Sequence, residues 1–187
     1  LDGLNRYYAV IRLIFVHLNY GTLSPLLEQF EYLDKLFSSG TYYSKRLLLN
    51  YYSQRLLLHS KSKDYEKAVY YGYLSIRGKN SDYLHYVNNL AAVLMRVKKY
   101  PEALSVMKAA YPDVKTTRNF HSKIGFVAFY IKCLNYNRQF KNAESYATAF
   151  LKAYKKEIFE YRWHLFFTAY FDALFRQSKY GKLLSVA

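Results

Sequence analysis

The chain has 187 residues, enough for a domain with a substantial core, and a formal net charge of +15, which favours an anionic partner. Hydrophobic residues make up 52% of it, yet no apolar run approaches the ~20 residues that a membrane-spanning helix needs. The single cysteine, Cys133, cannot form an internal disulfide, so nothing indicates an oxidising compartment. We therefore expect a cytoplasmic protein without a membrane span. We also interpret the chain as a piece of a longer protein, because it starts at Leu1 and stops at Ala187 in an apparent first helical turn.

Apolar residues recur at helical spacing along nearly the whole chain, and helix start and stop signals divide it into short segments. Residues 24–25, Ser-Pro, predict a helix start, and Gly40 predicts that helix's end. Residues 78–81 predict a second stop and restart. Pro101 predicts another helix start, and residues 112–113, Pro-Asp, predict its end. The result is a series of helices of ~10–20 residues with short connections, which is typical of helical hairpins.

Four segments share a phrase in which an aromatic residue is followed, three positions later, by a small or aliphatic residue. The aromatic residue stands at positions 65, 100, 140 and 180, and a weaker fifth copy has leucine at position 23. The spacings are therefore 42, 35, 40 and 40 residues. Recurrence at such a period is typical of a solenoid.

The phrase resembles the turn and second-helix start of the tetratricopeptide repeat, whose period is ~34 residues. In that family an aromatic residue begins the turn, and an alanine follows where the two helices pack closely. The third unit, roughly 83–115, matches best, through Leu90, Ala91, Leu94, Tyr100, Ala103 and Ala110. The resemblance covers nearly the whole chain and implies an all-α fold. It implies one domain, 1–187, built as a right-handed α-α superhelix (solenoid) of about five antiparallel helix pairs.

The sequence contains no convincing catalytic or metal-binding constellation. Its five histidines lie 26–43 residues apart, one in each unit, and no His-x-x-x-His or Glu-x-x-His pair is present. Cys133 lies in a predicted helix, where we expect it to be a small buried residue. We therefore predict no catalytic residue, no bound metal and no cofactor, and we do not expect an enzyme.

In the family that the chain resembles, the first helix of each pair lines a concave groove. Mapping that face onto this sequence selects mainly asparagines and cations, which suit the backbone and acidic groups of an extended peptide. The alternative is an ordinary solvated helix face. The selected residues are Arg12, Asn19, Asn50, His85, Asn88, Asn89, Arg96, Lys132, Asn135, Tyr136, Thr168, Asp172 and Arg176.

A second candidate surface is a short basic cluster formed by Lys115, Arg118 and Lys123. Between Asp113 and Glu144 the sequence has six Lys or Arg and no acid. We expect the cluster at the start of a helix, where cations oppose the helix dipole and an anion would be favoured. It would then contact an acidic protein surface or a phosphate backbone; a merely solvated basic face is the alternative.

These features favour a scaffold or sensor domain of a larger, regulatory protein, with an acidic protein or peptide as partner. The alternative is a nucleic-acid-binding module that uses a basic face, because residues 42–52 interleave tyrosines with cations. Packing on another domain of the same chain and self-association are further alternatives.

Overall fold

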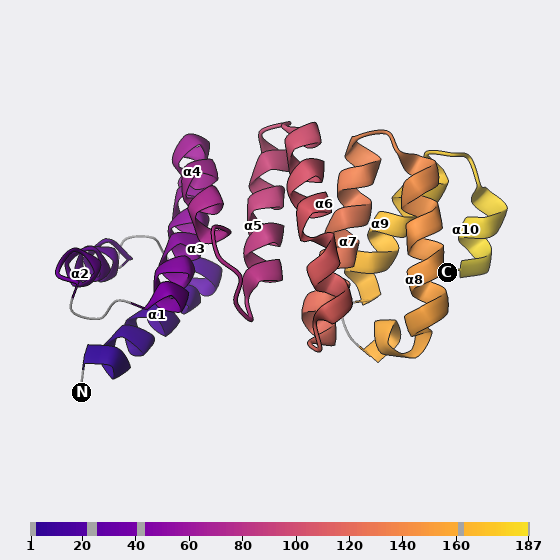
Figure 1. Ribbon diagram of the computed structural model, residues 1–187. Coiled ribbons are helices and arrows are strands. Elements are labelled where there is room, and N and C mark those ends of the chain that lie inside the picture. The colour runs from indigo at the N-terminus through magenta and orange to yellow at the C-terminus, as the bar shows by residue number, and fades with distance from the viewer. Residues whose placement is uncertain (1–2, 22–25, 41–43, 161–162, 187) are drawn as a thin grey trace. The chain divides into compact units, whose positions relative to one another are not determined.

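The computed structural model describes residues 3–21, 26–40, 44–160 and 163–186, and within these ranges it has ten helices and no strand (Figure 1). The predicted all-α class is confirmed. The chain forms two compact units, residues 1–90 and residues 91–187. The helices are α1 (Gly3–Tyr20), α2 (Leu26–Ser38), α3 (Lys45–Lys61), α4 (Tyr65–Ser75), α5 (Tyr83–Arg96), α6 (Tyr100–Thr116), α7 (Phe120–Tyr136), α8 (Phe140–Glu160), α9 (Trp163–Phe175) and α10 (Tyr180–Val186).

Of two predicted helix ends, the structure confirms one and contradicts the other. Gly40 follows α2 in the left-handed region, at φ 67°, as the stop signal predicted. The end predicted at Pro112 is wrong, because α6 continues through this proline to Thr116. Pro112 has no backbone N–H, so the helix loses one hydrogen bond there. The burial of Val114, two residues later, stabilises this part of the helix. The start predicted at residues 24–25 lies outside the described ranges.

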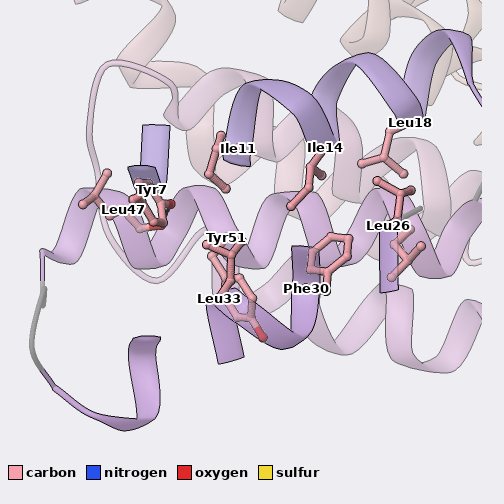
Figure 2. Close-up of a cluster of buried hydrophobic side chains, with 10 residues drawn as sticks. Tyr7, Ile11, Ile14, Leu18, Leu26, Phe30, Leu33, Leu47 and Tyr51 are labelled. Atoms are coloured by element: carbon pink, nitrogen blue, oxygen red, sulfur yellow. Dashed lines mark hydrogen bonds between the residues drawn. The ribbon is translucent and has the colours of Figure 1, made fainter. Parts of the chain in front are cut away.

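In residues 1–90 a hydrophobic cluster joins the first three helices (Figure 2). Its residues on α1 follow helical spacing, so one stripe of that helix is buried. The hydroxyl of Tyr7 reaches across and donates to the Leu47 carbonyl on α3, at 2.8 Å. The labelled members are Tyr7, Ile11, Ile14 and Leu18 from α1, Leu26, Phe30 and Leu33 from α2, and Leu47 and Tyr51 from α3.

A polar group built around Arg55 also ties α2 to α3. The Asp34 carboxylate accepts from both the Arg55 guanidinium and the Tyr51 hydroxyl. The guanidinium also lies 4.6 Å from the centre of the Phe30 ring, which is favourable cation–π geometry. Since the Arg55 side chain is only 15% exposed, its charge depends on these partners for compensation.

The four segments that share the sequence phrase also share one turn. Each has a non-glycine residue in the left-handed region two positions before the aromatic residue: Lys63, Lys98, Arg138 and Ser178, at φ 62°, 62°, 56° and 57°. The next amide donates in each case to the carbonyl five residues earlier, which closes the end of the preceding helix. In three copies the small residue after the aromatic, Ala68, Ala103 or Ala143, is fully buried.

In residues 91–187 a side-chain amide joins each of the last two turns to the turn before it. Asn137, at the end of α7, donates to the carbonyl of Tyr100 at 2.9 Å. Gln177, forty residues further on and after α9, donates to the carbonyl of Phe140 at 3.2 Å. Both amides also bond the carbonyl four residues earlier in their own helix. The bond therefore recurs at the same place in two successive turns and ends each time on the carbonyl of the turn aromatic, the first residue of α6 or α8.

A carboxylate fixes α10 onto α8 in the same unit. Glu144, only 8% exposed, accepts from Lys179 at 2.5 Å and from Lys182 at 2.7 Å. Burial alone would raise the pKa of Glu144, but hydrogen bonds from the two lysines and Gln177 outweigh it and lower this pKa to about 2. The carboxyl is therefore ionised in the folded protein at neutral pH.

Candidate partner-binding groove

A cavity in residues 91–187 lies between α7 and α9, which pack against each other. Its volume is about 520 Å³, within the range of small-molecule and peptide side-chain pockets. Six residues selected from the sequence come together in its lining: Lys132, Asn135 and Tyr136 from α7, and Thr168, Asp172 and Arg176 from α9 and its end. The face mapped from the sequence therefore forms one continuous groove in this unit.

Asn135 forms the floor of this groove rather than an exposed contact. We expected it to face a ligand, but it is only 6% exposed and donates from Nδ2 to the Ala169 carbonyl of α9 at 2.8 Å. Its Oδ1 makes no hydrogen bond within the described residues. Asn135 therefore holds the two walls together and leaves one acceptor at the base of the groove.

The groove has an excess of positive charge. Three cations line it, Lys132, Arg138 and Arg176, against the single carboxylate of Asp172. Arg176 donates to that carboxylate at 3.2 Å, so its charge is partly compensated. Lys132 is exposed, and it has no carboxylate partner in the part of the chain that the structure describes. An anionic group would therefore find an uncompensated ammonium on the α7 wall.

Apolar and aromatic side chains lie beside these charges. Tyr136 is 46% exposed, and its ring stacks on that of Tyr100, with centroids 4.9 Å apart and an interplanar angle of 9°. Because stacking fixes one face, the other is offered to the groove. Leu165 on α9 is 36% exposed, and Phe129 on α7 is half-buried. The groove can therefore hold an apolar side chain next to an acidic one.

Six residues of this lining were not selected from the sequence: Ala128, Phe129, Arg138, Phe140, Leu165 and Ala169. Phe129 and Leu165 lie three residues before Lys132 and Thr168, so extending the mapped face by one helical turn would have found them. Arg138 occupies the left-handed turn position, and no helical face includes it. Only the turn geometry places it in the lining.

The other residues of the mapped face are dispersed, and most belong to residues 1–90. Arg12 and His85 are exposed, Asn50 and Asn89 are half-buried, and Arg96 is exposed at the end of α5. The expectation for Asn88 is wrong: it is only 9% exposed, because it shares a face with the buried Leu84 and Ala91. The side chain of Asn19 lies outside the described residues.

The basic cluster is placed differently from expectation. Lys115 lies in the last turn of α6, where its charge complements the dipole, and its ammonium lies 5.6 Å from the Tyr111 ring centre. Arg118 is exposed in the connection to α7. Lys123 lies in the first turns of α7, 5.3 Å from the Tyr154 ring centre, and that helix has no acid in its first turn. Only Arg118 and Lys123 are therefore near a helix start.

The cysteine and the histidines, residue types that often act in catalysis or bind metals, lie on separate helices or in the core. Cys133 is fully buried, as expected, and burial raises the pKa of its thiol to about 12 although Lys132 opposes the shift. The five histidines lie on α1, α3, α5, α7 and α9. Within the described ranges no group of three His, Cys, Asp or Glu could hold a metal ion. The same residues include no helix long and apolar enough to cross a membrane.

The chain was compared with known protein families, curated proteins and solved structures. No protein family, curated protein or solved structure that was compared with the chain matches it.

Proposed function

We propose that this chain is a scaffold or sensor domain of a larger regulatory protein and binds an acidic protein or peptide segment in the groove between α7 and α9. We further propose that its helix pairs form a right-handed superhelix like that of tetratricopeptide repeats. The recurring left-handed turn and the recurring amide bonds of Asn137 and Gln177 support the repeat architecture.

One observation carries the binding proposal: residues chosen from the sequence as a ligand-facing set line a single groove with excess positive charge. An extended segment with an acidic side chain would reach Lys132, and an adjacent apolar side chain would rest against Tyr136 and Leu165. We therefore expect ligands in which Asp or Glu neighbours an apolar or aromatic residue.

Selection from a phage-displayed library of random peptides tests this proposal. Peptides enriched on the unaltered chain should contain the acidic–apolar pair, and their binding should fall at least about tenfold with Lys132→Glu combined with Arg176→Glu. The matched control is Lys152→Glu with Lys155→Glu, which reverses two exposed cations of α8 outside the groove lining. Selected peptides that bind both double variants equally well would refute the groove as the site.

Nucleic-acid binding is the second candidate, since residues 91–187 carry 17 Lys and Arg against six Asp and Glu. A mobility-shift assay with random RNA and DNA at about 150 mM salt separates the two functions. A shift that is lost on charge reversal of Lys115, Arg118 and Lys123 together would establish it. We expect no such shift.

A further inference from the structure

Within residues 91–187, successive helix pairs contact the pair that follows them through residues at the same sequence positions. Counted from the turn aromatic, the position five residues before it contacts the next pair: Met95 meets Cys133, with sulfurs 3.6 Å apart, and Asn135 bonds Ala169. The position four residues after the aromatic does the same, since Glu144 bonds Lys182 of α10 and Lys179 directly before it. We call these positions, with the turn aromatic itself, the downstream face.

The side that faces the preceding pair is equally regular. Ten residues before the aromatic, Tyr130 stacks on Tyr111 of α6, and Tyr170 hydrogen-bonds Thr148 of α8 at 2.9 Å. Seven residues before it, Cys133 meets Met95. Three residues before it, the amides of Asn137 and Gln177 reach the preceding turn. We call these three positions the upstream face.

The downstream face is exposed and apolar on α9 and α10. Phe175 is 59% exposed, although the equivalent Met95 and Asn135 are 8% and 6% exposed. Leu184 is 75% exposed, although the equivalent Leu104 and Glu144 are 5% and 8% exposed. Tyr180, the turn aromatic between them, is 53% exposed. These three side chains form an apolar surface at positions that elsewhere receive a helix pair.

The upstream face is exposed and apolar on α1. Counted from Leu23, the aligned turn residue, its three positions hold Leu13, Val16 and Tyr20, which are 43%, 50% and 84% exposed. Their spacing places them on one stripe of α1. At the position of Val16 the later pairs hold Leu58, Val93, Cys133 and Ala173, each at most 8% exposed. The chain thus exposes an upstream face on α1 and a downstream face on α9 and α10, the two surfaces that meet between successive helix pairs inside residues 91–187.

We propose that copies of this chain associate head to tail, with the α1 stripe of one copy packed on the α9–α10 surface of the next. The contact continues the pair-to-pair contact seen inside residues 91–187, and the six side chains that define its two surfaces are uncharged. Because the two surfaces differ, the association is heterologous, and it either closes into a ring or continues into a chain of copies. This proposal rests on the proposed repeat architecture but not on the groove. Failure of self-association would therefore leave the proposed peptide binding untouched, and the reverse also holds.

Sedimentation of the 187-residue chain between about 1 and 100 µM tests this proposal by mass action. We expect a mass that rises above the monomer's 22.2 kDa with concentration. The tail variant, Phe175→Lys with Leu184→Lys, and the head variant, Leu13→Lys with Val16→Lys, should each be monomeric. All four side chains are at least 43% exposed, so the helical circular dichroism should not change.

Mixing the two variants is the decisive step. The tail variant keeps an intact head and the head variant keeps an intact tail, so the mixture should form a dimer and nothing larger. The matched control, Tyr70→Lys with Phe159→Lys, alters two side chains that are 60% and 55% exposed elsewhere and should associate as the unaltered chain does. A monomeric unaltered chain, a self-associating tail variant, or a mixture without dimer would each overturn the proposal.

Discussion

The two halves of the molecule use the same turn but different polar interactions. The left-handed residue and its closing hydrogen bond occur at Lys63 in residues 1–90 and at three positions in residues 91–187. The first half uses bonds that do not recur, such as the Arg55 group that joins α2 to α3 and the Tyr7 hydroxyl bond from α1 to α3. The second half relies on recurring bonds, the turn amides of Asn137 and Gln177, together with Glu144.

Their charges differ as well. Residues 1–90 carry 11 Lys and Arg against seven Asp and Glu, a net +4, whereas residues 91–187 carry a net +11. The turn therefore occurs in both halves, whereas the side-chain amide that joins one turn to the one before it occurs at two turns of residues 91–187. At that position Val97 offers no side-chain donor, and Ser62 bonds only within its own helix in the described structure.

The largest expected effect is the loss of Arg55. Arg55→Met removes the guanidinium that compensates Asp34, so the free energy of unfolding of the first half should fall by about 2–3 kcal/mol. Arg176→Met is the comparison in the second half, because Arg176 makes an exposed pair with Asp172 and should lose under about 0.5 kcal/mol. Urea unfolding measures both, and equal losses would remove the distinction between the halves.

The second prediction concerns acid. The folded pKa of Glu144 is about 2, below its ordinary value of 4.5, so the unfolded chain binds more protons between these values. The stabilisation is therefore complete above pH ~4.5 and is lost as the pH falls toward ~2. Since the two lysines are 42% and 40% exposed, we expect about 1–2 kcal/mol. Unfolding measured against pH should show this loss for the unaltered chain, and a flatter profile for Glu144→Gln.

The third prediction concerns the recurring amides. Asn137→Ala and Gln177→Ala each remove a bond to a turn carbonyl together with a bond to a carbonyl of the preceding helix, so each should cost about 1 kcal/mol. Because the two sites are separate, the costs should add in the double variant. Asn142→Ala removes an exposed amide that bonds only the nearby Gln139 and serves as the control. If the control costs as much, the stacking role of the two amides is wrong.

The smallest expected effect tests what the halves share. Lys63→Gly and Lys98→Gly remove the strain of a side chain in the left-handed region, so each should stabilise its half by about 0.5 kcal/mol. Lys108→Gly, at an exposed position inside α6, should instead destabilise by about 1 kcal/mol. Thermal unfolding distinguishes the signs, and opposite responses at Lys63 and Lys98 would show that the turns are not equivalent.

Several features follow from the sequence alone. Helical spacing of apolar residues predicts the all-α class, and the recurring phrase locates four turns that have the same backbone geometry. Such local signals suffice because helix periodicity and turn closure involve residues within five positions of one another. The groove residues on α7 and α9 were selected for the same reason, since a helical face follows from spacing alone.

Tertiary structure decided the features that join distant residues. It buried Asn88, placed Asn135 in the groove floor against Ala169, and continued α6 through Pro112. It also paired Glu144 with lysines 35 and 38 positions away. The sequence by itself determined the helices and their turns, because these depend on local backbone hydrogen bonds. Only packing between helices decided which polar groups face a ligand and which hold the fold, because a partner distant in sequence satisfies each of them.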